Sequence, residues 1–128
     1  MTRAAWERNR IDVDFGEPEV AVVALHGEHE THGALALELR LLELPRRGRS
    51  LVVDLTATTF IDSAVLGALL RARARAGQAG AALVLVLGDD SERAIPRILS
   101  ITGLLRKFET AATRAEAVKA ARRTTVAA

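Results

Sequence analysis

The chain contains no cysteine and no tyrosine, and only 3% of its residues are aromatic. Without cysteine, neither disulfide bonds nor cysteine-ligated zinc sites can form. Few aromatic rings are available to stack on bases, and the formal net charge is only +2. Because the basic residues also come in short clusters, nucleic acid is not an expected partner.

Long apolar runs are also missing. No stretch approaches the roughly 20 apolar residues that a membrane-spanning helix requires. The first ten residues lack the apolar core of a secretory signal. We therefore expect a soluble, cytoplasmic protein that does not bind membranes.

The apolar residues that are present suffice for a single hydrophobic core, since they make up 49% of the 128 residues. No internal repeat or long linker divides the chain. Residues 11–123 are predicted to form one domain. Residues 1–10 are predicted to be an N-terminal extension, and residues 124–128 a C-terminal tail.

Strand and helix patterns alternate along the chain and predict an α/β domain. The expected elements are strands 11–15 and 20–25, helix 32–44, strand 51–55, helix 62–76, strand 82–87, a short helix capped by residues 89–91, a strand near 107–110 and helix 113–123. Pro96 predicts a kink or a delayed start in the short helix, and Gly103 marks its end. The order ββαβαβαβα favours a mixed, mostly parallel sheet packed by helices, with an antiparallel first hairpin.

Residues 51–67, LVVDLTATTFIDSAVLG, form the most informative segment. A buried strand is followed by a threonine-rich turn and then by a helix. Asp62 is predicted to be the N-cap of this helix, because its side chain can accept hydrogen bonds from backbone N–H groups of the first turn. Ser63 then begins the helix, where a kinase can reach its hydroxyl and where the helix dipole favours a phosphate.

This pattern resembles the STAS domain, and in particular the stand-alone bacterial anti-sigma factor antagonists. The resemblance extends over roughly residues 11–120. It rests on Val53-Asp54-Leu55, Phe60-Ile61-Asp62-Ser63-Ala64, Leu66-Gly67, the apolar strand 82–86, Ile98-Leu99, Thr102-Gly103-Leu104 and Phe108. The family usually has glycine where this chain has Val65.

The resemblance implies a binding protein without a cofactor, whose partner is an anti-sigma factor with serine kinase activity. The unphosphorylated form would bind that partner and release a sigma factor, and phosphorylation of Ser63 would end the binding. Thr58 and Thr59 are secondary candidates for phosphorylation. The alternative role within this fold is a scaffold subunit of a stress-sensing or lipid-transport complex. For a switch protein, we expect a monomer or a weak homodimer.

The chain also lacks the motifs of common enzymes. Ser63 lies at a strand–turn–helix junction, but Ile61 and Val65 occupy the places of the glycines in a nucleophile elbow. The phosphate-binding motifs G-x-x-x-x-G-K-[ST] and G-x-G-x-x-G do not occur. We therefore predict no enzymatic activity.

Helical periodicity divides residues 62–76 into two faces. The face predicted to pack on the sheet contains Val65, Leu66, Leu69, Leu70, Ala72 and Ala76. The opposite face begins with Ser63 and small side chains and ends with arginines that can pair with carboxylates. Together with the resemblance, this pattern predicts a partner-binding surface made of Asp62, Ser63, Ala64, Gly67, Ala68, Arg71 and Arg75.

Two apolar stripes run along the helix predicted at residues 32–44, although a helix on a sheet needs only one. Leu35, Leu39 and Leu42 form one stripe, and Leu37, Leu41 and Leu44 form the other. The preferred interpretation is that the C-terminal helix covers the second stripe. The alternative is an exposed patch for self-association or a partner.

Three histidines lie close together in the sequence as His26, His29 and His32, beside Glu28 and Glu30. Imidazoles and carboxylates are ligands of zinc and nickel, so a metal-binding loop is an alternative function. The spacing is one residue short of H-E-x-x-H. The preferred interpretation is a solvent-exposed polar loop that binds no metal, in which Glu30 supplies the acidic residue common in the family.

Overall fold

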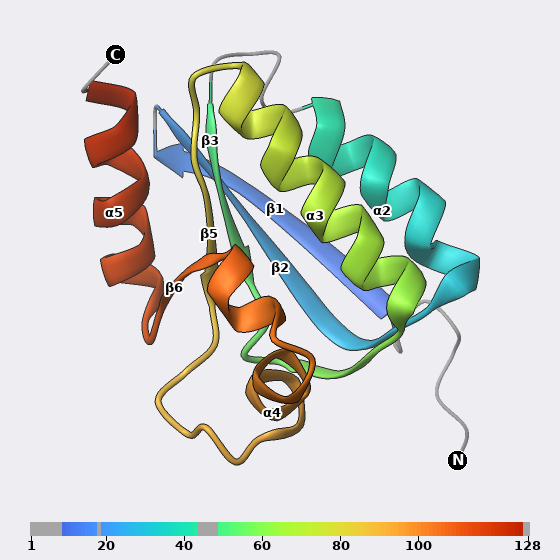
Figure 1. Ribbon diagram of the computed structural model, residues 1–128. Helices are drawn as coiled ribbons and strands as arrows, with labels where there is room; N and C mark the ends of the chain where they lie inside the picture. Colours follow the sequence, from blue (N-terminus) through green and yellow to red (C-terminus); the bar gives the residue numbers. More distant parts are fainter. Residues whose placement is uncertain (1–8, 18, 44–48, 127–128) are drawn as a thin grey trace.

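The computed structural model describes residues 9–17, 19–43 and 49–126 (Figure 1). Six strands form one sheet: β1 (Asn9–Glu17), β2 (Val20–His29), β3 (Ser50–Asp54), β4 (Thr58–Ile61), β5 (Leu83–Val86) and β6 (Glu109–Ala111). β1 and β2 form an antiparallel hairpin, and the four other pairings of these strands are parallel. The order is β1-β2-β3-β5-β6, with β4 paired to β2. The predicted mixed, mostly parallel sheet is therefore confirmed.

The helices cover the two faces of the sheet unequally (Figure 1). They are α2 (Thr31–Glu43), α3 (Ser63–Gln78), α4 (Ala94–Ile101), the 3₁₀ helix η2 (Leu104–Lys107) and α5 (Arg114–Val126). One face carries α2, α3 and α4, whose apolar residues join the larger core cluster. Among the described helices, only α5 covers the other face.

Both faces of the central strands are buried, which explains their nearly continuous apolar sequences. Successive side chains in a strand point to opposite faces. In β3, Leu51 and Val53 pack against the layer of α2, α3 and α4, whereas Val52 packs against Ala117 and Ala121 of α5. The small alanines let α5 lie close to the sheet. The predicted single core is thus split by the sheet into two layers.

The threonine-rich turn predicted after residue 55 is wrong at residues 58–61, which form β4. This short strand pairs in parallel with the end of β2, so β2 continues beyond its predicted end to His29. The Thr58 hydroxyl donates a 2.8 Å hydrogen bond to the carbonyl oxygen of Leu25. Thr58 is only 3% exposed, which excludes it as a phosphorylation site in the folded protein, whereas Thr59 is exposed.

The extension of β2 also corrects the predicted histidine loop, since His26 and His29 belong to this strand and His32 belongs to α2. His29 is only 2% exposed, and its Nε2 donates to the carbonyl oxygen of His26 at 3.2 Å. Burial lowers the pKa of His29. Nowhere in residues 9–17, 19–43 and 49–126 do three His, Cys, Asp or Glu side chains gather as a metal site. The metal-binding alternative therefore has no assembled ligand set in this part of the chain.

The helix after β5 begins later than its predicted cap. Residues 89–91 do not cap it, because α4 starts at Ala94 with Arg93 as its N-cap residue. Pro96 lies in the first turn of α4, where a missing N–H costs little, and the predicted delayed start is confirmed. Gly103 follows the C-cap Thr102 with a φ of 77°, a conformation that glycine adopts without strain, as expected for a helix terminator.

The two apolar stripes of α2 have different environments. Leu37 and Leu41 are fully buried, whereas Leu35 and Leu39 are 68% and 60% exposed. The expectation that the C-terminal helix covers the extra stripe is wrong, because α5 lies on the opposite face of the sheet (Figure 1). Leu35 and Leu39 thus form an exposed patch, while Leu44 lies outside the described residues.

The predicted limits of the domain remain predictions, although two elements cross them. β1 begins at Asn9 and α5 continues to Val126. Residues 1–8 and 127–128 of the predicted extension and tail lie outside the described residues. None of the described helices has the length and apolar character required to span a membrane.

Candidate functional site

Asp62 joins the beginnings of two helices. Its backbone is extended (φ −104°, ψ −177°), and its Oδ1 accepts a 3.0 Å hydrogen bond from the N–H of Val65 in the first turn of α3. Its Oδ2 accepts from the backbone N–H and the hydroxyl of Thr31, the first residue of α2, both at 2.8 Å. The predicted N-cap is confirmed, and the carboxylate also holds α2 against α3.

These donors favour the ionised carboxylate. Hydrogen bonds from the backbone of Val65 and from the hydroxyl of Thr31 hold the pKa of Asp62 below its ordinary value. Asp62 therefore remains negatively charged at neutral pH, directly before Ser63. The charge also opposes the positive end of the α3 dipole.

We expect Asp62→Ala to lower the melting temperature by a few degrees, because the variant loses the cap of α3 and the link to Thr31. Circular dichroism during heating measures this change. Asp62→Asn keeps one carbonyl oxygen as an acceptor and should lose less. A melting temperature of Asp62→Ala equal to that of the wild type would show that the cap contributes nothing.

Ser63 is exposed and is the first residue of α3. Its position follows from two local features, the end of β4 at Ile61 and the cap at Asp62. The loop that leads into β4 is held in turn by Asp54, whose Oδ1 accepts from the N–H and the hydroxyl of Thr56 at 2.9 and 2.7 Å. Arg93 donates to the carbonyl oxygen of Thr56 at 2.8 Å. Hydrogen bonds thus hold the chain both before β4, at Thr56, and directly before Ser63, at Asp62.

The exposed face of α3 is narrower than predicted. Ala68 was expected on it, but Ala68 is fully buried. The buried residues of the helix are Val65, Ala68, Leu69, Ala72 and Ala76. Leu66 and Leu70, expected inside, are only partly buried at the edge of the core. The prediction from helical periodicity assumed that only the sheet buries this helix. In the structure, α2 also packs beside α3 and buries part of it.

Arg71 is exposed but already paired within the molecule. Its Nε donates to Oε1 of Glu38 on α2 at 2.9 Å, and this bond lowers the pKa of Glu38. The guanidinium lies over Gly67, where an added Cβ would come within 3.2 Å of Arg71 Nη1. Arg71 can therefore contact a partner only while it remains bonded to Glu38, or after that bond breaks.

The remaining predicted residues lie around Ser63 or farther along α3. Asp62, Ala64 and Gly67 are half-buried next to it in the first turns. Arg75 is also half-buried, and its Nε has no hydrogen-bond partner among the described residues. The structure thus brings Asp62, Ser63, Ala64, Gly67 and Arg71 to one surface, which we call the Ser63 surface. It does not bring Ala68 there.

Sequence reasoning missed three residues of this region. Thr31 binds Asp62 from 31 positions away, and no local pattern indicates such a contact. Glu38 lies on the same helix as the two apolar stripes, and nothing in the sequence indicated that it pairs with Arg71. Phe60 was part of the family motif, but its exposure of 44% at the end of β4 was not foreseen. A large exposed apolar side chain three residues before Ser63 adds contact area to the surface.

Comparison with known proteins identifies the fold. The chain is similar to the structure of an anti-sigma factor antagonist from Mycobacterium paratuberculosis, with 26% identity over 94% of this chain and 99% of that chain and a TM-score of 0.78. It is also similar to an anti-sigma factor antagonist (STAS) domain protein from Planctomyces limnophilus, with 18% identity, coverage of 88% and 97%, and a TM-score of 0.72.

A third similar structure is the Bacillus cell fate determinant SpoIIAA in its phosphorylated form, with 18% identity, coverage of 85% and 96%, and a TM-score of 0.63. At identities of 18%, the second and third similarities show the fold alone. No curated protein sequence matches the chain. A family model described as the STAS domain matches residues 15–117, most of the chain. The protein therefore belongs to the STAS domain family.

Proposed function

We propose that this protein is an anti-sigma factor antagonist that binds an anti-sigma factor with serine kinase activity and is switched off by phosphorylation of Ser63. The observation that carries the proposal is the exposed Ser63 at the start of α3, capped by Asp62. The similar structure described as an anti-sigma factor antagonist from Mycobacterium paratuberculosis supports the general role.

The Ser63 surface has the properties of a protein contact. Its centre combines a hydroxyl with small side chains at Ala64 and Gly67, so another backbone can approach closely. Phe60 and the half-buried Leu66 supply apolar area at its border. Desolvation of such a surface, with a small polar centre, costs little free energy. A charge placed at the centre raises that cost.

Phosphorylation would change the electrostatics of this surface. A phosphate brings a charge of roughly −1.5 to −2 to the centre of the contact. It would lie beside the ionised Asp62, which already occupies the N–H of Val65. The dipole of α3 would therefore stabilise the phosphate only partly in the free protein, and a close partner would have to desolvate two adjacent negative groups.

The proposed role is non-catalytic and needs no cofactor, since the partner supplies the kinase. The place of action would be the cytoplasm, where sigma factors bind RNA polymerase. We expect the protein to be a monomer or a weak homodimer in this role.

The exposed patch of Leu35 and Leu39 favours a second candidate function, a scaffold subunit in a larger STAS assembly. The two leucines are one helical turn apart on α2 and face solvent, so they could pack against another subunit. Size-exclusion chromatography separates the two roles, because a switch protein elutes as a monomer or dimer and a scaffold subunit as a large complex with its partners.

We expect transcription that depends on the cognate sigma factor to rise when this protein is added to RNA polymerase, the sigma factor and the anti-sigma kinase. The physical reason is competition, because an anti-sigma factor held on the Ser63 surface cannot hold its sigma factor. The measurement is a reconstituted run-off assay, with Ser63→Glu as the matched variant that should fail to activate. An unchanged transcript level with the wild-type protein would exclude the proposed pathway.

A further inference from the structure

The carboxyl ends of β5 and β6 form a crevice between the two helical layers. These strands are parallel neighbours, but their following helices lie on opposite faces of the sheet. β5 leads to α4 in the larger layer, and β6 leads to α5 on the other face (Figure 1). In open α/β sheets, ligands bind at such switch points, because the diverging connections leave a gap beyond the strand ends.

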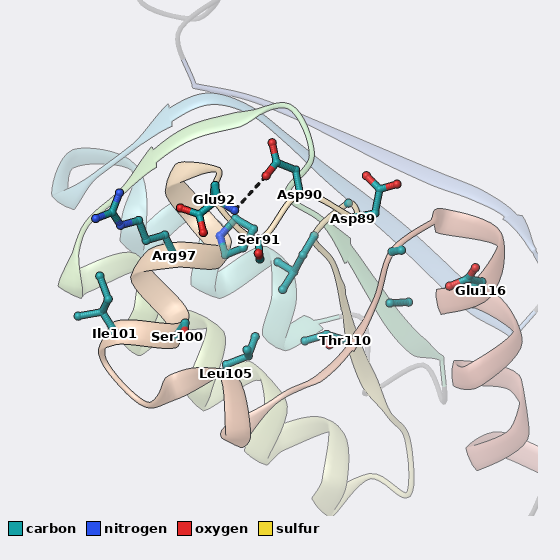
Figure 2. A pocket seen from close by; sticks show the side chains of 15 residues that line it. Asp89, Asp90, Ser91, Glu92, Arg97, Ser100, Ile101, Leu105, Thr110 and Glu116 are labelled. Atoms are coloured by element: carbon teal, nitrogen blue, oxygen red, sulfur yellow. Dashed lines mark hydrogen bonds between the residues drawn. The ribbon is translucent and has the colours of Figure 1, made fainter.

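A cavity of about 720 Å³ occupies this switch point (Figure 2). Its apolar lining includes Leu87 at the end of β5, Pro96 on α4, Leu105 on η2 and Ala111 on β6. The volume falls within the roughly 300–1,000 Å³ of typical small-molecule sites. The cavity is therefore large enough for an organic molecule, and its lining can bury an apolar body.

Carboxylates dominate the charged groups around the cavity. Asp89, Asp90, Glu92 and Glu116 line it, against the single guanidinium of Arg97. Figure 2 shows the first three in the loop after β5 and Glu116 across the cavity on α5, while the guanidinium of Arg97 points outward. Within the described part of the chain, no side chain pairs with the carboxylates of Asp89, Glu92 or Glu116. The charged side chains that line the cavity are thus mostly negative, although the whole chain carries a net charge of +2.

We propose that this cavity binds an organic cation, a primary ammonium or guanidinium group carried on an apolar body. The carboxylates approach from both sides and suit a cation of some size. They are too dispersed to ligate a metal ion, since no three of them gather as a metal site in the described residues. The apolar wall suits the body of the ligand, and Ser91, Ser100 and Thr110 offer hydroxyl oxygens as further acceptors. This proposal does not depend on the switch at Ser63.

The test is an NMR titration of the ¹⁵N-labelled protein with 2-phenylethylamine as the probe. Amides of residues 88–92 and 110–112 should shift and saturate, with a Kd in the millimolar range expected for so small a ligand. N-acetyl-2-phenylethylamine has the same apolar body without the charge, and it should bind at least roughly tenfold more weakly. A cationic side chain of another protein is a second source of the same chemistry, and the tripeptide acetyl-Leu-Arg-Leu-amide tests it. Tighter binding of the peptide than of the amine would assign the cation to a protein side chain.

The double variant Asp89→Asn/Glu92→Gln should weaken binding of the amine several-fold. Both side chains are exposed, so the substitutions should leave the fold intact. Glu109→Gln, an exposed acid outside the cavity, is the matched control and should leave the Kd unchanged. Equal affinity for the amine and its acetylated analogue would overturn the proposal. Shifts that do not saturate, or that are unaffected by the double variant, would overturn it as well.

Discussion

Phosphorylation of Ser63 is expected to weaken binding of the anti-sigma partner by roughly a hundredfold, equivalent to about 3 kcal/mol. Ser63 lies in the centre of the Ser63 surface, next to the ionised Asp62. A complex would therefore enclose a phosphate beside a carboxylate, while Arg71 of the same surface is engaged by Glu38. Isothermal titration calorimetry with the phosphorylated and unphosphorylated proteins measures the difference.

Three variants isolate this effect. Ser63→Ala should accept no phosphate from the kinase and keep its affinity, because it removes only an exposed hydroxyl. Ser63→Glu should bind more weakly, although a carboxylate carries less charge than a phosphate. Gln78→Glu is the matched control, since it adds the same charge to an exposed site on the same helix, about 22 Å away by helix rise. Full phosphorylation of Ser63→Ala would transfer the assignment to another residue, with Thr59 the first to test.

The largest loss of stability is expected for Asp54→Ala, about 2–4 kcal/mol in the free energy of unfolding. The Asp54 carboxylate is nearly buried at the end of β3 and accepts four hydrogen bonds. Two come from Thr56, and two come from Arg114 at the start of α5, with Nη2 at 2.8 Å. The variant would leave the partly buried N–H of Thr56 without its acceptor and release the first turn of α5. Urea unfolding measures the loss.

Acid should remove the same stabilisation from the wild-type protein. Burial alone raises the pKa of Asp54, but the hydrogen bonds from Thr56 and Arg114 outweigh it, and the net pKa lies below the ordinary value of 3.8. A carboxylate with a depressed pKa contributes its full stability above its unfolded pKa and loses it as the pH falls through its folded pKa. The difference between wild type and Asp54→Ala should therefore be constant near neutral pH and shrink below about pH 4.

Arg114→Ala provides the control for the ion pair. Its side chain is 47% exposed, so its removal should cost only about 1 kcal/mol, with Thr56 still bound to Asp54. Equal losses in Arg114→Ala and Asp54→Ala would mean that Asp54 stabilises the protein through its ion pair with Arg114 and not through the loop before β4. An unchanged urea midpoint in Asp54→Ala would contradict the predicted role altogether.

The sequence by itself determined the main elements and the start of α3. The strand at residues 50–54 and the helix from Ser63 followed from apolar runs, helical periodicity and the capping preference of Asp62, all of which act between near neighbours. The order of alternating strands and helices was sufficient to predict a mostly parallel sheet, since parallel strands require crossover connections. The STAS resemblance was visible for the same reason, because its motif is a contiguous strand, turn and helix start.

Only the tertiary structure decided which of these residues meet and which face solvent. Ala68 is buried because α2 packs against α3, and Arg71 is paired because that packing brings Glu38 beside it. β4, whose residues were predicted to form a turn, forms because the end of β2 offers backbone partners to four residues that favour strands. The cavity beyond β5 and β6 exists because α4 and α5 leave the sheet on opposite faces. Each of these features depends on contacts between distant segments, and a periodic pattern within one segment carries no information about the neighbour that will cover it.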